Sequence, residues 1–268
     1  MRDATSAQLP EWSKIVQAND SWRWHDHQLV EKNANYLAHS SPKRNGPLAR
    51  FIVSHVHGRQ NRSANVKRVI ASALASLKPG QYGLNFGSGF VRIAPFVLNL
   101  DIARMPVTDL VSAGGLLTPF KDNSLGLIIS QEVLEHVRDP HAAIAEFHRI
   151  LTSDGLLVLQ LPFMIGYHPG PEDLWRFSKE AYAQLLPSDR WKIESQSITV
   201  GHGTGFHRIL TEFAAVHFSI FGNKFYRAAK GFFSLLFFPF VLFDIATPYL
   251  PEKDRIPGGY IVTVKPLK

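Results

Sequence analysis

Two glycines and an aspartate carry the clearest chemical signal in the sequence. Gly87 and Gly89 enclose Ser88 directly after an apolar run, and Asp101 lies at the end of the next such run. A glycine has no Cβ, so the backbone of this turn can approach a ligand closely. An acidic residue ending the second strand of a doubly wound sheet can accept hydrogen bonds from both hydroxyls of a ribose. Alone, the turn is a weak signal, since any tight turn can use Gly-Ser-Gly.

A second polar segment, residues 167–177, offers groups that can act on an acceptor. His168 can serve as a general base near neutral pH, and we expect it to be catalytic. Four neighbouring polar residues suit an acceptor with several hydroxyls, and we expect them to bind substrate: Tyr167, Glu172, Asp173 and Arg176. The alternative for Arg176, Trp175 and Phe177 is simple packing before the next helix.

Glu132, Glu135 and His136 form a Glu-x-x-Glu-His set, and His136 is our second expected catalytic residue. Side chains at positions i, i+3 and i+4 share one face of a helix. Carboxylates with an imidazole, joined by His168 in space, suit magnesium or manganese moderately. The same string can instead pack and cap. The sequence favours packing, so we assign no metal ligands and leave a divalent metal open.

Alternating strands and helices must position these residues. Apolar runs predict strands at 82–86, 96–102, 108–111, 125–130, 156–161, 191–200 and 260–264. Helical spacing predicts helices over 65–77 and 141–151 and a further helix from Ser178. Asp139 and Pro140 are suited to begin the second of these helices. This alternation predicts a layered α/β fold.

Two longer stretches make the pattern specific. Residues 123–140 (NSLGLIISQEVLEHVRDP) resemble the fourth-strand region of the methyltransferase type 11 family, a group of class I S-adenosylmethionine-dependent methyltransferases. Residues 146–156 resemble that family's next helix and fifth strand, and 116–120 resemble its loop beside the adenine. The resemblance covers 81–186 and the closing strand at Tyr260. It implies a doubly wound Rossmann-like sheet, mostly parallel with an antiparallel last strand, and a helical insertion before that strand.

The same resemblance implies S-adenosylmethionine as the cofactor. The residues it places at the cofactor are Phe86, Gly87, Ser88, Gly89, Asp101, Ile102, Leu116, Leu117 and Gln131. In this arrangement Asp101 holds the ribose, the two leucines flank the adenine, and Gln131 lies near the sulfonium. The implied function is methyl transfer to a small-molecule, glycan or lipid-linked acceptor, and we expect O-methylation.

The chain departs from the family pattern in three places. Asn85 and Gly114 stand where the family often has acids. Only 11 residues, Phe90 to Leu100, separate Gly89 from Asp101, too few for a full helix and a strand. We therefore expect the first crossover helix to be reduced to a turn. Some methyltransferases of polysaccharide biosynthesis are similar in this shortening, in the 167–177 segment and in a late apolar insertion.

We expect three parts in the chain: a basic N-terminal extension with short helices (1–64), a methyltransferase domain (65–205 and 257–268) and an apolar helical insertion (206–256). Within the insertion, Gly231 to Phe243 has 13 residues without a charge, fewer than the ~20 that span a bilayer. Pro239 is expected to kink it. The insertion either covers the substrate pocket or lies in an anionic membrane surface, with Lys224, Arg227 and Lys230 near the headgroups.

Composition leaves the remaining alternatives open. The 268 residues have a net charge of +7 and no cysteine, which excludes disulfides and thiolate chemistry. No apolar signal stretch follows the start of the sequence, so we expect a cytoplasmic protein, peripheral on the inner membrane face if the insertion binds lipid. Between Lys32 and Leu100, a stretch without Asp or Glu, basic residues cluster: Lys43, Arg44, Arg50, Arg59, Arg62, Lys67 and Arg68. Without a nucleic-acid-binding motif this basic cluster is weak evidence for RNA, and we do not expect a nucleic-acid partner. A non-catalytic binding protein on the same fold is the main alternative.

Overall fold

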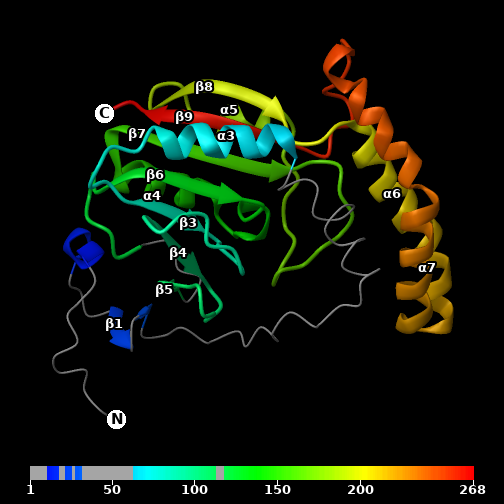
Figure 1. Cartoon of the computed structure of the whole chain (residues 1–268), viewed down its shortest axis with the longest axis horizontal. Helices are drawn as coiled ribbons and strands as arrows, with labels where there is room; N and C mark the ends of the chain where they lie inside the picture. Colours follow the sequence, from blue (N-terminus) through cyan, green and yellow to red (C-terminus); the bar gives the residue numbers. More distant parts are fainter. Residues whose placement is uncertain (1–10, 18–21, 26–27, 32–62, 113–117) are drawn as a thin grey trace.

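A computed structural model describes residues 11–17, 22–25, 28–31, 63–112 and 118–268 (Figure 1). Within these ranges the chain forms one sheet in the order β1-β2-β5-β4-β3-β6-β7-β9-β8. The strands are β1 (Trp22–His25), β2 (Gln28–Glu31), β3 (Gly83–Phe86), β4 (Val97–Asp101), β5 (Leu110–Val111), β6 (Leu125–Gln131), β7 (Leu151–Pro162), β8 (Trp191–Ile198) and β9 (Gly259–Pro266).

The sheet is parallel from β2 through β7, and β9 runs antiparallel to both β7 and β8. The chain proceeds from β3 outward to β4 and β5, and then returns to β6 on the other side of β3. Ligands of such sheets bind beyond the carboxyl ends of the strands, where the strand order reverses. The predicted doubly wound, mostly parallel fold is confirmed, and the reversal lies between β3 and β6.

Helices cover both faces of the sheet and bury its central strands. The helices are α3 (Ala64–Ala75), α4 (Pro140–Ile150), α5 (Ala181–Leu185), α6 (His202–Val216) and α7 (Asn223–Leu236). The α3 face of the sheet buries Leu127 and Ile129 of β6 beneath Val66 of α3. On the other face, Phe147 of α4 contacts Phe86 of β3, with ring centroids 4.9 Å apart. Both faces of β6 are therefore apolar, as the continuous run 125–130 predicts.

Helix α4 begins where the sequence predicts, but the loop predicted after it is absent. Asp139 caps it by accepting a hydrogen bond from the Ala142 N–H at 2.9 Å, and Pro140 occupies the first turn. The helix passes directly into β7, which begins at Leu151 rather than at Leu156 as predicted. Leu151 already pairs with Leu125 of β6, so tertiary pairing extends the strand over residues that look turn-like in sequence.

The predicted loss of the first crossover helix is confirmed. Residues 87–96, all described, connect β3 to β4 through turns alone. Polar side chains hold this short connection in place. The Asn85 amide donates to Asn99 Oδ1 and to the Val91 carbonyl, both at 3.2 Å, and Asn99 Nδ2 donates to the Val107 carbonyl at 2.8 Å. A buried hydrogen-bond network thus replaces the packing that a helix would supply.

The N-terminal part differs from the prediction of short helices alone. One short helix is present, η1 (Glu11–Ile15), but β1 and β2 were not predicted. Leu29 and Val30 of β2 pair with Leu110 and Val111 of β5, so this segment extends the edge of the main sheet. Of the basic cluster, only Lys67 and Arg68 fall within the described residues, on α3.

The insertion before β9 is helical, as predicted. It contains α6, η4 (His217–Phe221), α7, η5 (Phe238–Ile245) and η6 (Thr247–Tyr249). Figure 1 shows α6 and α7 packed together beside the sheet, and we call α6 through η6 the arm. Pro239 lies at the start of η5, where the axis bends by 43° after α7. Among the described residues, no single helix has the length and apolar composition to cross a membrane, although α7 and η5 reach both as a bent pair.

Candidate functional site

A cavity of about 560 Å³ lies at the carboxyl ends of β3, β4, β5 and β6. Its walls include Gly87 after β3, Asp101 and Ile102 at the end of β4, Ser112 after β5 and Val133 after β6. The cavity therefore occupies the edge where the strand order reverses, as ligand sites of doubly wound sheets do. Its volume lies within the range of about 300–1,000 Å³ typical of small-molecule and cofactor sites.

The glycine turn is shaped for close contact on two sides. Gly87 has φ +71° and Gly89 has φ +53°, a region that residues with a Cβ rarely adopt. A Cβ on Gly87 would lie 2.3 Å from Val133 Cγ2, so the turn packs tightly against the residues after β6. A Cβ on Gly89 would meet no atom within 4 Å. The turn thus presents Gly89 toward open space beside the cavity.

Asp101 binds the glycine turn and still has acceptor capacity. Its Oδ2 accepts a hydrogen bond from the Gly89 N–H at 2.7 Å, and its Oδ1 accepts from the Ala103 N–H at 2.9 Å. A carboxylate offers about four lone-pair sites, so about two are left toward the cavity. Asp101 is 9% exposed and lines the cavity wall.

The structure brings together most, but not all, of the predicted cofactor residues. Five of them line the cavity: Phe86, Gly87, Gly89, Asp101 and Ile102. Ser88 is buried within the turn, and the Gln131 side chain donates to Gln160 on β7 at 2.9 Å; neither is among the lining residues. Leu116, Leu117 and Gly114 lie outside the described residues.

Several lining residues are not predicted from the sequence, among them Met105, Ser112 and Val133. A signal existed for Ser112, because it directly follows a predicted strand of a parallel sheet. Met105 lies in the connection between β4 and β5, and nothing in the sequence marks that loop as part of a cavity.

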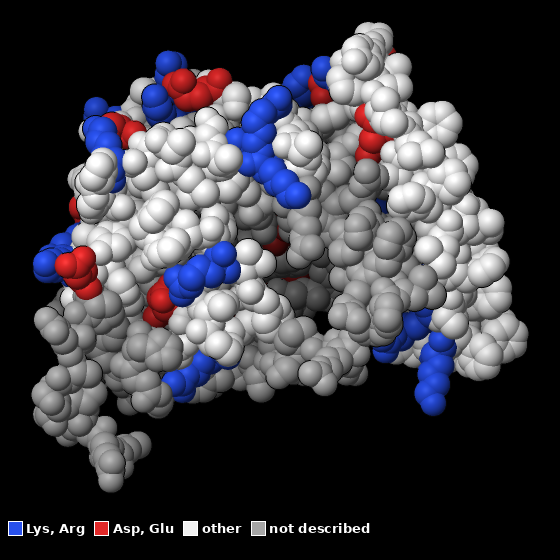
Figure 2. All heavy atoms as spheres, in the orientation of Figure 1, with Lys and Arg blue, Asp and Glu red and all other residues white. Residues whose placement is uncertain are grey.

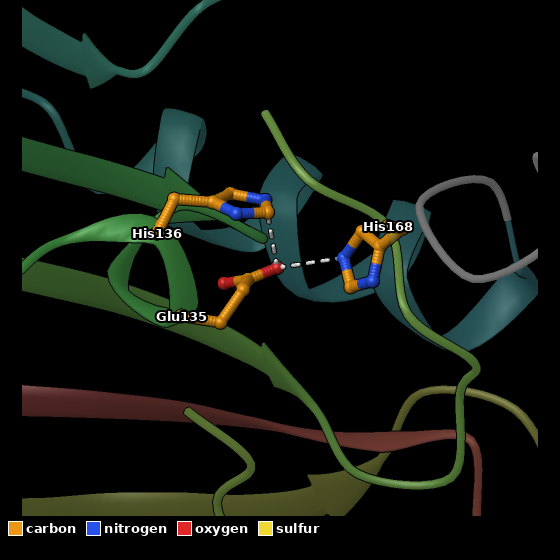
Figure 3. Close-up of side chains that lie close together, drawn as sticks. All are labelled: Glu135, His136 and His168. Atoms are coloured by element: carbon orange, nitrogen blue, oxygen red, sulfur yellow. Dashed lines mark ion pairs between the residues drawn. The ribbon is translucent and has the colours of Figure 1, made fainter. Parts of the chain in front are cut away.

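Beyond the cavity, three predicted residues meet although 32 positions separate two of them. The rings of His136 and His168 lie with centroids 5.1 Å apart, and Glu135 is placed between them (Figure 3). Glu135 Oε1 is 3.6 Å from His136 Nε2 and 3.5 Å from His168 Nε2. The neighbouring Glu135 carboxylate raises the pKa of His168 above its ordinary value, against the opposing effect of burial. His136 lines the cavity, whereas His168 is not among its lining residues.

Glu132 does not belong to this group of three, although the sequence places it in the same set. It follows β6 with φ +55°, an uncommon conformation for a residue with a side chain, and lines the cavity. The short helix η3 (Leu134–His136) holds Glu135 and His136 only.

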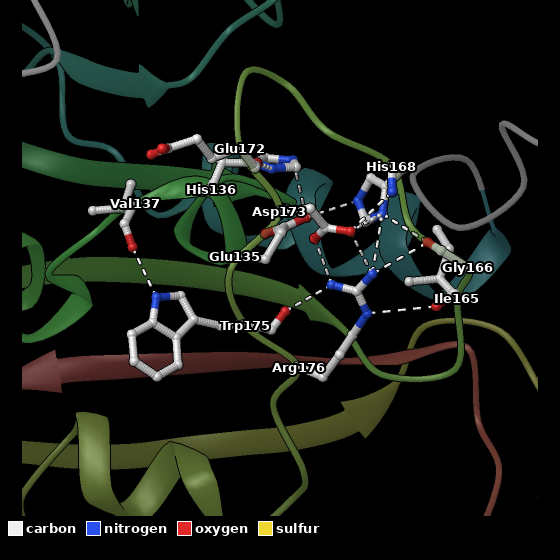
Figure 4. Close-up of polar contacts among 10 residues, drawn as sticks. All are labelled: Glu135, His136, Val137, Ile165, Gly166, His168, Glu172, Asp173, Trp175 and Arg176. Atoms are coloured by element: carbon white, nitrogen blue, oxygen red, sulfur yellow. Dashed lines mark hydrogen bonds and ion pairs between the residues drawn. The ribbon is translucent and has the colours of Figure 1, made fainter.

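The 167–177 segment is fixed by its own ion pairs (Figure 4). Arg176 donates to both oxygens of Asp173, at 2.6 and 2.7 Å, and the backbone N–H of His168 donates to Asp173 Oδ2 at 2.9 Å. Arg176 thereby holds the pKa of the Asp173 carboxyl well below its usual range. Asp173 and Arg176, both predicted to bind substrate, are engaged with each other and position His168.

The other two predicted substrate residues lie nearer the solvent. Glu172 lines the cavity and forms an ion pair with Arg138 at 2.8 Å. This pair joins the 167–177 segment, which we call the 170s loop, to the residues before α4. Tyr167 is 76% exposed. The 170s loop is also fixed by backbone contacts, since the Glu135 carbonyl accepts from the N–H groups of Leu174 and Trp175.

Comparison with known families decides what kind of domain this is. A family model described as a methyltransferase domain matches residues 82–159, which hold the glycine turn, Asp101 and the Glu-x-x-Glu-His set. This part of the chain is thus similar to a methyltransferase domain. The resemblance stated from the sequence is thus confirmed. A search of curated proteins finds no match.

Solved structures similar to this chain share little sequence with it. The SpnF cyclase is 16% identical, with 75% of this chain and 80% of that chain covered and a TM-score of 0.46. The cyclopropane synthase MmaA2 of Mycobacterium tuberculosis is 14% identical, with 75% and 84% covered and a TM-score of 0.44. Coclaurine N-methyltransferase is 12% identical, with 75% and 73% covered and a TM-score of 0.43.

Proposed function

We propose that this protein is an S-adenosylmethionine-dependent methyltransferase whose cofactor occupies the cavity beside Gly87 and Asp101. The observation that carries the proposal is the position of this cavity, at the reversal of strand order and within the segment that matches the methyltransferase domain. The spare lone pairs of Asp101 suit ribose hydroxyls, and the open space at Gly89 suits a ligand in contact with backbone.

The acceptor would enter next to His136 and Glu172, which line the same cavity as the glycine turn. For a hydroxyl acceptor, the oxygen forms a bond to the methyl carbon as the carbon–sulfur bond breaks. The electron pair of that bond stays on sulfur, and S-adenosylhomocysteine leaves. The hydroxyl proton passes to a basic group or to water, and the cluster of Glu135, His136 and His168 supplies basic atoms at this wall. We therefore keep His136 and His168 as the proposed catalytic residues.

The arm favours an acceptor at a membrane surface, such as a lipid-linked sugar. Large apolar side chains are exposed along it, including Phe225 at 58%, Phe232 at 62% and Ile245 at 75%. Figure 2 shows this side of the molecule largely without charge. Patches of this extent on a single chain mark interaction surfaces. Lys224 and Arg227 lie on the same helix as the two phenylalanines, which suits a helix at the surface of an anionic membrane on its cytoplasmic side.

Liposome sedimentation tests the membrane part. The full chain is expected to sediment with vesicles containing anionic lipid, and Phe225→Ser with Phe232→Ser is expected to reduce the bound fraction. Ile193→Ser, which removes an exposed apolar side chain on β8, outside the arm, is the matched control. Equal sedimentation of all three proteins, or no sedimentation of the wild type, would remove the membrane part and leave the arm as a cover for the cavity.

Transfer of a labelled methyl group from S-adenosylmethionine tests the enzymatic part. A panel of glycans and lipid-linked sugars should yield a labelled product with the wild type and much less with His136→Asn. Cofactor binding without transfer to any acceptor would favour the alternative, a non-catalytic binding protein on the same fold.

A further inference from the structure

With both histidine rings neutral, three hydrogen-bond acceptors converge on one point and none of them supplies a donor. The shared atom is Glu135 Oε1, which both histidines approach with their Nε2 atoms (Figure 3). Glu135 is fully buried, and neither of its carboxylate oxygens has a hydrogen-bond partner. Burying an ionised carboxylate without a partner is costly, because the charge loses its hydration. The site therefore calls for a positive group between these side chains.

The hydrogen bonds of His136 settle which of its ring nitrogens is free. Its Nδ1 contacts the backbone carbonyl of Glu172. A carbonyl oxygen can only accept, so Nδ1 carries the proton and donates it. In the neutral ring Nε2 then has a lone pair, and this lone pair faces the Glu135 carboxylate.

The same reasoning holds for His168, with one extra neighbour to consider (Figure 4). Its Nδ1 lies 3.1 Å from the Gly166 carbonyl and 3.4 Å from Asp173 Oδ2, both acceptors. Arg176 Nη2 lies 3.4 Å away, but its two hydrogens already bond Gly166 O at 3.2 Å and Asp173 Oδ2 at 2.7 Å. Nδ1 therefore carries the proton. In the neutral ring, His168 Nε2 then has a lone pair on the side of Glu135, and this atom has no hydrogen-bond partner.

We propose that Glu135, His136 and His168 bind a divalent cation of a first-row transition metal. Metal–nitrogen and metal–oxygen bonds of about 2.0–2.2 Å place neighbouring ligand atoms about 3.0–3.5 Å apart. The two measured separations are 3.5 and 3.6 Å, and all three ligand atoms lie within 4.8 Å of one another. Two imidazoles with one carboxylate suit zinc, iron, cobalt or manganese, whereas magnesium and calcium prefer oxygen ligands alone.

The surrounding contacts are those that metal-binding histidines require. Each ring donates its other N–H to a backbone carbonyl, which fixes its orientation and tautomer. Asp173 and Arg176, through their ion pair, hold the loop that carries His168. Three protein ligands leave coordination positions open for a further ligand, and one of the three, His136, lines the cavity. Resting on the proposed function, an acceptor hydroxyl bound to the cation would lose its proton to water more readily, and the two histidines would then act by holding the cation instead of accepting the proton themselves.

Titration with Co²⁺ tests this inference on the full chain after treatment with a chelator. Visible absorption reports imidazole and carboxylate coordination, and calorimetry gives the stoichiometry. We expect one Co²⁺ per chain, bound much more tightly than Mg²⁺. Glu135→Gln and His168→Asn should each weaken binding by at least about 100-fold, since even outer hydrogen-bond partners of metal ligands contribute about 10- to 100-fold. Glu180→Gln and His141→Asn, at exposed positions, are matched controls and should bind as the wild type does.

Circular dichroism and the melting temperature show whether each variant is folded, and His168→Asn remains informative if the buried Glu135→Gln is not. Absence of saturable Co²⁺ binding to the folded wild type, or equal binding by His168→Asn and His141→Asn, would overturn the inference. Binding of S-adenosylhomocysteine is measured on the same samples. A failed methyltransferase assignment with intact cation binding is therefore distinguishable from a failed cation site.

Discussion

Gly87 and Val133 are packed so closely that no side chain fits on the glycine. A Cβ at Gly87 would lie 2.3 Å from Val133 Cγ2, and the backbone there has φ +71°. Gly87→Ala therefore combines a steric clash with a strained backbone, which alone costs about 1–3 kcal/mol. We expect a clear fall in melting temperature, measured by circular dichroism, together with weaker cofactor binding.

Gly89→Ala is the matched control for that substitution. Its φ of +53° gives backbone strain, but its Cβ would meet nothing within 4 Å. The loss of stability should be smaller than for Gly87→Ala, and the main effect should fall on cofactor affinity. A Gly89→Ala protein less stable than Gly87→Ala would contradict the packing described for this turn.

Asn85 stands where related domains often have an acid, and restoring that acid should harm this protein. The Asn85 amide donates to Asn99 Oδ1 and to the Val91 carbonyl, both acceptors. Asn85→Asp would place a buried carboxylate against those acceptors. Unfolding with urea should show a loss of about 1–3 kcal/mol, the cost of an unsatisfied buried polar group. Unchanged stability would mean that the network does not hold the short connection.

The sequence predicts the strands of this sheet well and its edges poorly. Continuous apolar runs such as 125–130 can be buried on both faces only in a central strand, which makes β6 readable from one sequence. By contrast, β1 and β2 have four residues each; β1 pairs only with β2, and β2 joins the sheet by pairing with β5, some 80 positions away. The early start of β7 depends likewise on Leu125 of β6. Such pairings leave no periodic pattern in the segment itself.

Part of the candidate site could likewise be predicted from the sequence, and part depends on contacts between distant segments. Gly87, Gly89 and Asp101 can be recognised from their residue types and from their positions after two apolar runs. The structure places all three at one cavity. The approach of His168 to Glu135 depends on how the 170s loop folds back onto η3, through hydrogen bonds to the Glu135 carbonyl. Sequence spacing also grouped Glu132 with Glu135, whereas only Glu135 meets both histidines in the structure, and Glu132 precedes η3.

Two ion pairs of the 170s loop should differ in their effect on stability. Asp173 has 1% of its side chain exposed and accepts two hydrogen bonds from Arg176. Asp173→Asn should cost about 1–3 kcal/mol in urea unfolding, since it removes a charge-assisted bidentate contact. Arg138→Ala breaks an exposed pair with Glu172 and should leave stability nearly unchanged. Equal losses would show that burial does not set the strength of these pairs.

Glu146 should influence cofactor binding from a position outside the cavity. Its Oε1 accepts hydrogen bonds from the Thr118 N–H at 2.7 Å and from the Thr118 hydroxyl at 2.6 Å, and Arg149 pairs with the same carboxylate. Thr118 directly follows Leu116 and Leu117, which the family resemblance places at the adenine.

Glu146→Gln should weaken S-adenosylmethionine affinity several-fold and reduce stability by about 1–3 kcal/mol, because Arg149 loses a buried anion. Calorimetry and thermal unfolding measure both effects. Asp122→Asn, at the other, exposed partner of Arg149, is the control. If Glu146→Gln binds S-adenosylmethionine as tightly as the wild type does, Glu146 has no influence on the cofactor site.

Calorimetry with S-adenosylhomocysteine most directly tests whether the cavity beside Gly87 and Asp101 is the cofactor site. The wild type should bind one molecule per chain. Asp101→Asn, which keeps the shape of the side chain but removes its charge, should bind at least about 10-fold more weakly, a loss of about 1.4 kcal/mol. Asp109→Asn is a control, because Asp109 pairs with Arg92 and does not line the cavity. No binding by the folded wild type, or equal affinity for wild type and Asp101→Asn, would contradict the assignment of this cavity.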